Sequence, residues 1–530
     1  MGKGFDYIVV GSGSSGAVIA ARLSEDPEVR VLLLEAGPRD RHPLQHVPLA
    51  FPRLALGRIG TWQYESEPEP GLRGRTLPSP RGRTLGGTSS INAMIAIRGN
   101  PRDYDDWAAQ GLNGWSYAEV LPYFRRLENH WRGASEWHGG DGPVGITRME
   151  GPDLQWEPLR QAAEAVGIAF NEDPNGAAQD GISIMEATVT GGRRASTASA
   201  YLRPAMARDN LTVETGALAS RIVVRGGRAI GVEYRQRRRL LTELAAREVI
   251  LCGGAYNSPQ LLMLSGIGPA DELRMLDIAP VHDLPGVGRN LAEHPNVINE
   301  YDLNDDLGLT RHLRMDRVVR AALRWRRHGD GPFAQTGTLA NVFARTLPGL
   351  DRPDVQLMCL PMSGDARLWL PGQRPFPARL SARCGFLHPH SRGSVTLRSA
   401  DPADPPRIRF NLFAEPEDLA GMVRALELSR EIYASSPLRE LLAHEVRPGP
   451  DKSDLAEYIR RNAGIRSHPV GTCRMGLDDD AVVDPELRVR GIDRLRIADA
   501  SIMPSLPSGN TNLPCIIIGE KAADLIRGSA

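Results

Sequence analysis

The sequence has 530 residues, of which 41 % are apolar and 24 % are charged, so it is long enough to bury two large cores in about two to three domains. Its 64 basic and 64 acidic side chains cancel. This balance argues against a nucleic-acid partner, a polyanionic substrate or an anionic membrane surface.

The cysteines and the hydropathy pattern predict a protein of the reducing cytoplasm. The five cysteines are odd in number and form no CxxC pair, so we expect neither a disulfide framework nor a metal site. No stretch approaches the roughly 20 apolar residues that cross a bilayer, and no basic segment followed by an apolar one opens the chain as in a secretory signal. We therefore expect a cytoplasmic protein without a membrane span.

Residues 5–37, FDYIVVGSGSSGAVIAARLSEDPEVRVLLLEAG, predict a strand, a tight turn, a helix and a second strand that ends at Glu35. Gly11, Gly13 and Gly16 allow the backbone to approach a pyrophosphate, and the helix begins with unpaired N–H groups. The carboxylate of Glu35 can accept hydrogen bonds from ribose hydroxyls, and it argues against a 2′-phosphate. The pattern predicts an ADP-binding half-site that serves either NAD or FAD; the alternative is a βαβ unit whose glycines only pack.

A second glycine-rich stretch lies at residues 82–107, where Gly86 and Gly87 precede small polar residues and the apolar run 93–97. Two interpretations are open from the residues alone. The loop either presses its backbone against a flat ligand or simply connects two elements and caps a helix.

An arginine-rich stretch at residues 314–327 predicts an amphipathic helix whose basic side faces water. Val318, Ala321, Ala322 and Trp325 form its apolar side. A partner surface on the basic side is the alternative.

Four separated motifs resemble the glucose–methanol–choline (GMC) family of FAD oxidoreductases. They are the glycine turn, GRTLGGTSSINAMIAIRG at 82–99, GAYNSPQLLMLSGIG at 254–268, and a C-terminal pattern of SHPVGTCRMG at 467–476, RIADASIMP at 496–504 and SGNTNLP at 508–514. They occur in the family's order and span nearly the whole chain. Several stretches between them are similar to the sorbose, polyethylene-glycol and choline dehydrogenase branch of the family.

The resemblance implies an α/β fold in two parts. A Rossmann-like FAD-binding domain would consist of residues 1–150, 214–294 and 463–530. A discontinuous α+β substrate domain, built on an antiparallel sheet plus helices, would take 151–213 and 295–462, with a strand near 393–398 and a helix near 418–432.

The resemblance also assigns cofactor-binding residues. They are Gly11, Gly13, Ser14, Ser15, Gly16, Glu35, Ala36, Gly86, Gly87, Ser90, Asn92, Ala93, Leu218, Asp499, Ala500, Asn512 and Pro514. Some relatives bond the flavin covalently through a histidine, and Ile91 occupies that position here. Because an alkyl side chain cannot form this bond, we expect non-covalent FAD.

The expected chemistry is transfer of a hydride from an alcohol to flavin N5. A base near neutral pKa must take the hydroxyl proton, and a histidine meets this need. The family pattern implies His468 as that base and Asn512 as the donor that steadies the developing alkoxide. The plainer interpretations are a solvated loop histidine and an asparagine just before a last helix that starts at Pro514; His294 and His138 are further polar candidates without an implied base role.

Arg466 departs from the family, which commonly has a small or aliphatic residue two positions before the histidine. One hypothesis is that its guanidinium binds a substrate carboxylate or another strongly polar group. The plainer interpretation, which we favour from the sequence, is that the side chain leaves the pocket for solvent.

We expect the substrate to be a primary or secondary alcohol, either polar and polyol- or sugar-like or small and aliphatic, that yields an aldehyde or ketone. The electron acceptor is expected to be a quinone- or dye-type compound or oxygen. The alternatives are an oxygen-using oxidase of aryl, furanic or pyridoxine-type alcohols, a hydroxynitrile lyase, a fatty-acid photodecarboxylase or a binding-only flavoprotein. The low aromatic content, 5 %, gives no indication of an aromatic cage for a quaternary ammonium.

Overall fold

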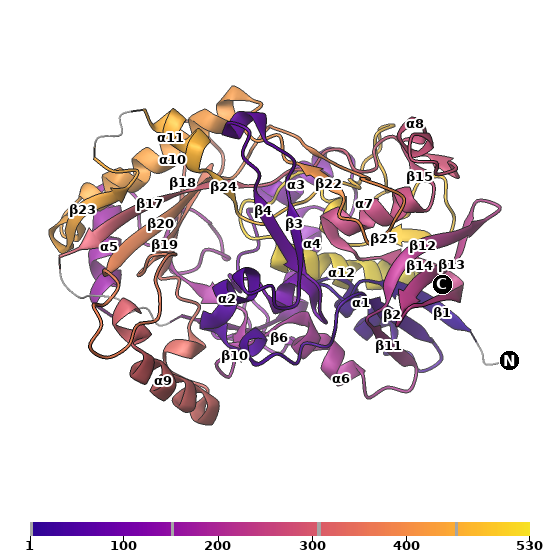
Figure 1. Ribbon diagram of the computed structural model, residues 1–530, viewed down its shortest axis with the longest axis horizontal. Helices are drawn as coiled ribbons and strands as arrows, with labels where there is room; N and C mark the ends of the chain where they lie inside the picture. Colours follow the sequence, from indigo (N-terminus) through magenta and orange to yellow (C-terminus); the bar gives the residue numbers. More distant parts are fainter. Residues whose placement is uncertain (1–3, 150–152, 305–308, 451–453, 530) are drawn as a thin grey trace.

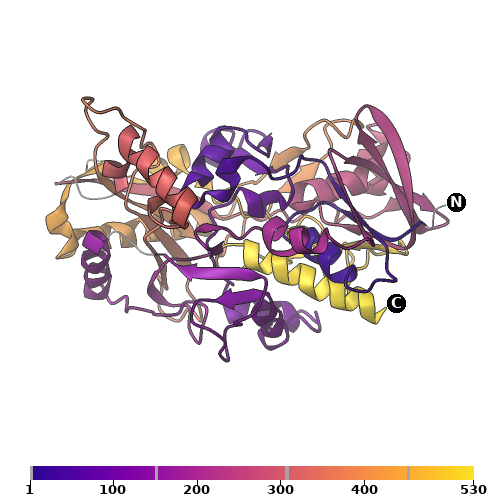
Figure 2. The same ribbon diagram turned by 90° about the horizontal axis from the view of Figure 1, so that it is seen from below.

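The computed structural model describes residues 4–149, 153–304, 309–450 and 454–529. Two seven-stranded sheets organise the chain, one beside both termini and the other at the opposite end of the molecule (Figures 1 and 2). The expected boundary between residues 150 and 151 lies outside the described residues. The division into two discontinuous domains stays a prediction.

The first sheet is the predicted Rossmann-like sheet. Its strand order is β11 (Leu211–Thr215), β2 (Val31–Glu35), β1 (Phe5–Val10), β14 (Arg239–Leu251), β13 (Arg228–Gln236) and β12 (Leu218–Arg225), and β25 (Leu495–Ile497) pairs with β14. Strands β11, β2, β1, β14 and β25 run parallel, and β12 and β13 extend the sheet as an antiparallel hairpin. Every residue of β2 is buried, as expected for a strand that is covered on both faces. The predicted α/β class is confirmed.

Two helices cover this sheet close to the glycine turn. Helix α1 (Gly16–Leu23) follows β1 as predicted. Helix α12 (Asn512–Gly528) lies against it, and a Cβ at Gly519 would come within 2.7 Å of the Ser15 carbonyl oxygen. This close approach explains the glycine in the middle of a long helix. The predicted start of α12 at Pro514 is wrong by two residues, because Thr511 and not Leu513 is its N-cap.

The second sheet is antiparallel. Its order is β23 (Leu442–Arg447), β17 (Pro295–Leu303), β20 (Arg379–Phe386), β19 (Val355–Leu360), β18 (Ala340–Ala344) and β7 (Gly181–Ile184), and β24 (Gly464–Ile465) pairs with β17. Leu357, Cys359, Ala382 and Cys384 belong to a core that includes α10 (Pro416–Ala434). Because side chains alternate along a strand, Met358 and Arg383 point to the other face. Met358 and Arg383 line a cavity that also reaches the ends of β1, β2 and β14.

The remaining elements connect and cover the two sheets. They are α2 (Phe51–Leu56), β3 (Thr61–Glu65), β4 (Pro78–Gly82), α3 (Pro101–Ala109), α4 (Tyr117–Leu127), β5 (Glu128–His130), β6 (Val144–Arg148), α5 (Asp153–Ala165), β8 (Glu186–Ala187), β9 (Val189–Thr190), β10 (Arg193–Arg194), α6 (Arg203–Ala205), α7 (Gly254–Leu264), β15 (Ile267–Gly268), α8 (Ala270–Arg274), β16 (His282–Asp283), α9 (Met315–His328), β21 (Ser394–Thr396), β22 (Arg407–Arg409) and α11 (Leu455–Asn462). Helices α9 and α10 and strand β21 confirm the three elements expected near 314–327, 418–432 and 393–398. Within the described ranges, no helix is long and apolar enough to cross a membrane.

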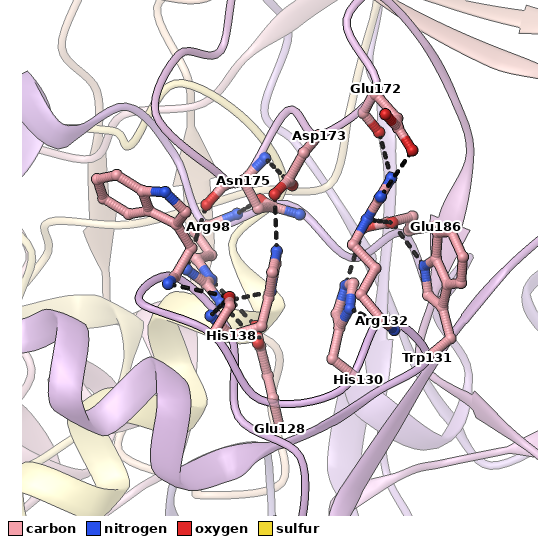
Figure 3. Close-up of polar contacts among 12 residues, drawn as sticks. Arg98, Glu128, His130, Trp131, Arg132, His138, Glu172, Asp173, Asn175 and Glu186 are labelled. Atoms are coloured by element: carbon pink, nitrogen blue, oxygen red, sulfur yellow. Dashed lines mark hydrogen bonds and ion pairs between the residues drawn. The ribbon is translucent and has the colours of Figure 1, made fainter.

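A buried ionic cluster joins β5 to the segment that follows the second glycine-rich loop (Figure 3). Arg98 donates to both carboxylate oxygens of Glu128, at 3.0 and 2.6 Å. His138 bridges Glu128 and Asp173 at 3.0 and 2.9 Å. Burial lowers the pKa of His138, but these two carboxylates outweigh it and raise the pKa to about 8. His138 therefore belongs to a structural cluster and does not line the central cavity.

We expect Arg98→Met to destabilise the protein strongly, because it leaves the buried carboxylate of Glu128 without its guanidinium. The free energy of unfolding should fall by about 3–5 kcal/mol. Urea denaturation followed by circular dichroism measures it. Arg102→Met, which removes an exposed arginine close by, is the control and should change the free energy by less than about 0.5 kcal/mol.

Candidate active site

A large cavity lies between the two sheets. Its volume is about 1710 Å³, and its wall contains residues of both sheets and of α9. Ligand pockets for one drug-sized molecule measure about 300–1,000 Å³, so this cavity has room for a dinucleotide and a second, smaller molecule. Val318, Ala321, Ala322 and Trp325 of α9 face the cavity, as the apolar side of the predicted helix should.

Most of the predicted cofactor residues line this cavity. They are Gly11, Gly13, Ser14, Ser15, Glu35, Ala36, Gly87, Asn92, Ala93, Leu218, Asp499, Ala500 and Asn512. The other four, Gly16, Gly86, Ser90 and Pro514, are not among the lining residues, and their contact with the cofactor stays a prediction. The hydroxyl of Ser90 donates to the Leu85 carbonyl oxygen at 2.6 Å, and a Cβ at Gly16 would lie 2.0 Å from the Gly11 carbonyl oxygen. These two residues shape the loops that carry the wall.

The glycine turn after β1 has no room for a side chain at its first glycine. Gly11 has a φ of +99°, and a Cβ there would lie 2.4 Å from the Cys252 carbonyl oxygen. Helix α1 then begins without a capping side chain and without an acidic residue in its first turn. Its positive N-terminal end therefore remains available to an anion at Ser14 and Ser15 of the cavity wall.

Glu35 is fixed in the cavity wall at the end of β2. One carboxylate oxygen accepts from the Ser12 backbone N–H and hydroxyl at 3.1 and 2.6 Å, and the other accepts from the Gly37 N–H at 2.7 Å. Burial raises the pKa of Glu35, and these donors oppose that rise. Together with the turn, this arrangement fits the adenosine and diphosphate part of FAD.

The second glycine-rich loop packs directly on the first. Gly87 has a φ of +52°, and a Cβ there would come within 2.7 Å of the Gly13 Cα atom. The neighbouring Ile91 and Asn92 line the cavity. Arg194, which the sequence did not single out, donates to the Asn92 side-chain oxygen at 2.8 Å and holds that side chain in place. This placement favours the ligand-contacting interpretation of the loop.

His468 lies in the wall of the same cavity, in the segment after β24. Its backbone N–H donates to Glu293 Oε1 at 2.8 Å, and the same oxygen accepts the His294 N–H at 2.9 Å. Its Nδ1 atom lies 3.0 Å from Nδ1 of His294, and its Nε2 atom lies 3.1 Å from the amide nitrogen of Asn510. Burial raises the pKa of Glu293 to about 8. The sequence had singled out neither Glu293 nor Asn510.

The hydrogen-bond partners assign the protons of both imidazoles. His294 Nε2 lies 3.0 Å from the Leu387 carbonyl oxygen, which can only accept, so this nitrogen carries the proton. Burial, and then the charge of Arg466, lower the pKa of His294 to about 3, so the ring is neutral and its Nδ1 accepts. His468 must then donate from its own Nδ1. Its Nε2 keeps a lone pair, toward which the Asn510 amide donates.

The structure places Asn510, and not the predicted Asn512, within hydrogen-bond distance of His468 Nε2, and the role of Asn512 beside the substrate stays a prediction. Asn510 is the amide beside His468, whereas the Asn512 side-chain oxygen accepts from the Ser14 hydroxyl at 2.9 Å. The reason is the start of α12, since Asn512 is its first residue and lies against the N-terminal end of α1. Both residues line the cavity, but at different parts of the expected cofactor.

Arg466 lies in the cavity wall, and the expectation that it leaves for solvent is wrong. Its guanidinium donates to the side chain and the carbonyl oxygen of Gln356 and to the Arg383 carbonyl oxygen. It rests on Gly385, where a Cβ would lie 2.4 Å from its Nε atom. Burial lowers the pKa of Arg466 to about 9. In the described part of the chain, no carboxylate forms an ion pair with it.

Family models match two large parts of the chain. Both are described as GMC oxidoreductase, and they match residues 5–296 and 389–519. Together these ranges cover most of the sequence and include the glycine turn, His468 and Asn510.

Curated relatives match over nearly the full length. The chain is 42 % identical to the mitochondrial choline dehydrogenase of Mus musculus, over 99 % of this chain and 89 % of that protein. It is 41 % identical to the oxygen-dependent choline dehydrogenase of Photobacterium profundum, over 100 % of this chain and 94 % of that protein.

Solved structures share the fold. Pyridoxine 4-oxidase from Mesorbium loti aligns with a TM-score of 0.87 and 31 % identity over 98 % of both chains. An R554A variant of formate oxidase from Aspergillus oryzae RIB40 aligns with a TM-score of 0.93 and 28 % identity over 100 % of this chain and 99 % of that one.

We expect Gly87→Ala to weaken FAD binding, because the added methyl group would push the second loop away from Gly13. The affinity for FAD should fall by about tenfold or more. Titration of the apoprotein with FAD, followed by flavin fluorescence, measures it. Gly74→Ala is the matched control, since Gly74 also has a positive φ but has nothing within 4 Å of its Cβ position; an equal loss in both variants would contradict the steric explanation.

We expect Asn510→Ala and Asn512→Ala to have different effects. Loss of the Asn510 donor should slow anaerobic flavin reduction by an alcohol by about 10²-fold with little change in FAD content. Asn512→Ala should mainly weaken FAD retention, because its partner is Ser14 in the glycine turn. Stopped-flow absorbance and flavin content measure the two effects. A larger loss of rate in Asn512→Ala than in Asn510→Ala would contradict this assignment and favour Asn512 as the residue that stabilises the alkoxide.

Proposed function

Because the chain belongs to the GMC oxidoreductase family, we propose that His468 is the base with which this FAD-dependent enzyme oxidises a primary or secondary alcohol to an aldehyde or ketone. The chain is an FAD-dependent alcohol oxidoreductase, in agreement with its choline dehydrogenase relatives. The observation that supports the proposal is the unprotonated Nε2 of His468 in a buried, cavity-lining ring, where a substrate hydroxyl can replace the hydrogen bond from the Asn510 amide.

The cofactor site is divided among three parts of the chain. The glycine turn and α1 would hold the diphosphate, Glu35 the ribose, and the loop around Gly87 and Ile91 the flavin end. When bound, FAD supplies the hydride acceptor of the reaction. Ile91 offers no nucleophile to the flavin, so we propose that the cofactor is held without a covalent bond.

The residues beside the alcohol accept its proton, stabilise its oxygen and position the base. His468 Nε2 accepts the hydroxyl proton while the C–H bond loses its hydride, which leaves a neutral carbonyl product. The amide N–H of Asn510 is placed to donate to the oxygen as negative charge develops on it. His294 keeps the base in the required tautomer through the bond between the two Nδ1 atoms, and it acts as a positioning residue.

The acceptor and the compartment are also proposals. Electrons would pass to a quinone- or dye-type compound or to oxygen. The rates at which each acceptor reoxidises the reduced enzyme show which one it uses. A cytoplasmic location is supported by cysteines that are all free in the structure.

We expect anaerobic mixing with polar, polyol-like or small aliphatic alcohols to bleach the flavin of the wild-type enzyme, and His468→Ala to slow this reduction by about 10²–10⁴-fold.

Burial lowers the pKa of His468 far below its usual range, and the charges of Arg466 and Arg81 add to the effect. Because the ring is neutral above that lowered pKa, the reduction rate should stay level as pH falls from about 8 to about 6.5.

The controls separate the base from the fold. His468→Ala should retain FAD and the wild-type circular dichroism spectrum. An acid limb centred above pH 6.5 would contradict the buried neutral base. Flavin that no alcohol bleaches would contradict alcohol oxidation and favour lyase or photochemical use of the same scaffold.

A further inference from the structure

Arg383 places a guanidinium in the cavity wall. It lies in the middle of β20, opposite Ile298 of β17 and Met358 of β19, and all three side chains line the cavity. Among the residues that the structure describes, none forms an ion pair or a side-chain hydrogen bond with its guanidinium. Burial lowers the pKa of Arg383, and no neighbouring carboxylate counteracts it.

A second arginine of the same strand forms ion pairs and serves as a comparison. Arg379, four residues earlier on the same face, donates to Asp302 at 2.7 Å and to Glu300 at 3.0 Å. A half-buried guanidinium without such a partner is costly unless a ligand supplies the missing anion. Arg383 therefore differs from its neighbour by facing the cavity instead of a carboxylate.

The charges around Arg383 favour an anion. Arg466 adds a second buried guanidinium, which donates to the Arg383 carbonyl oxygen at 2.8 Å. The carboxylates of the described cavity wall are already engaged: Glu35 binds Ser12 and Gly37, Asp499 binds Ser258 and the Gly254 N–H, and Asp365 pairs with Arg447. This part of the wall is therefore positive, and it disfavours a substrate with a cationic group.

The sheet surface beside Arg383 is apolar. Ile298, Met358 and Leu360 of the sheet face line the same cavity beside Arg383. Gly385, on which Arg466 rests, lies two residues, about 7 Å, along β20 from Arg383. A molecule that reaches from His468 to Arg383 would pass the row of Gly385, over which Arg466 lies, and would meet the apolar side chains beside Arg383 with an aliphatic part.

We propose that Arg383 binds a carboxylate at the far end of the alcohol whose hydroxyl meets His468, so that the substrate is a hydroxy-carboxylate with an aliphatic spacer. The proposal rests on the proposed function, since it names the substrate class of the same site. Arg466 supports it by holding β20 and by adding positive charge. Its two terminal nitrogens already bind Gln356 and Arg383 and its Nε atom lies over Gly385, so it is not the main ligand of the carboxylate.

The experiment compares ω-hydroxyhexanoate with ω-hydroxyhexanamide, which has the same length without the charge, in anaerobic flavin reduction. In the wild-type enzyme the acid should give the higher kcat/KM. Arg383→Met should lower kcat/KM for the acid by about 10²-fold and for the amide by less than about threefold. Arg383→Lys should recover part of the difference. Arg53→Met removes an exposed arginine of the same cavity wall and should leave the ratio unchanged.

A binding measurement separates this proposal from the proposed function. Hexanoate has no hydroxyl to oxidise, and its binding is read from the perturbation of the flavin absorbance. Arg383→Met should weaken that binding by about 10²-fold while the FAD content stays at the wild-type level.

The outcomes are distinct. Reduction by acid and amide at equal rates, with no effect of Arg383→Met on hexanoate binding, overturns the carboxylate site and leaves alcohol oxidation standing. Flavin that no alcohol reduces, together with hexanoate binding that depends on Arg383, overturns alcohol oxidation and keeps the site. Failure of both measurements overturns both.

Discussion

The hydrogen bond between the Nδ1 atoms of His294 and His468 is the interaction on which the candidate active site depends. It exists only if one ring donates and the other accepts, so it requires that the accepting ring be neutral and that its Nδ1 carry no proton. The Leu387 carbonyl oxygen fixes the first tautomer, and burial keeps both rings uncharged. Glu293 holds the two backbone segments together through a single oxygen. The basicity of Nε2 is thus set by groups that do not touch the substrate.

The fold brings these groups together from distant parts of the chain. His294 precedes β17, Leu387 follows β20 and His468 follows β24, so three segments meet at one end of the second sheet. Asn510 comes from the turn before α12, which packs on α1 beside the glycine turn of the first sheet. The base and its amide neighbour therefore belong to different sheets, and the cavity for cofactor and substrate lies where the two sheets face each other.

The sequence predicted the parts whose information is local. The period of the apolar residues, the spacing of the glycines and the acidic residue at the end of β2 are enough to predict the strand–turn–helix–strand unit. The helical spacing of apolar residues is enough to predict α9 and α10. The choice between Asn510 and Asn512 depends on the residue at which α12 starts, which a motif of seven letters leaves undetermined. The place of Arg466 depends on the missing side chain of Gly385 and on acceptors of Gln356, both far away in the sequence. Such tertiary contacts have no local signal.

The positive charge near the base has two effects with opposite consequences for proton transfer. Arg466 lowers the proton affinity of His468, which by itself makes the ring a weaker base. The same charge stabilises the alkoxide that forms when the hydroxyl proton leaves, and in a buried site this attraction is stronger than in water. Proton transfer can then remain near balance while the ring stays neutral between turnovers. A hydroxy-carboxylate held by Arg383 would bring a negative charge into this wall and partly offset the depression of the imidazole pKa, so that binding such a substrate would strengthen the base just before it acts.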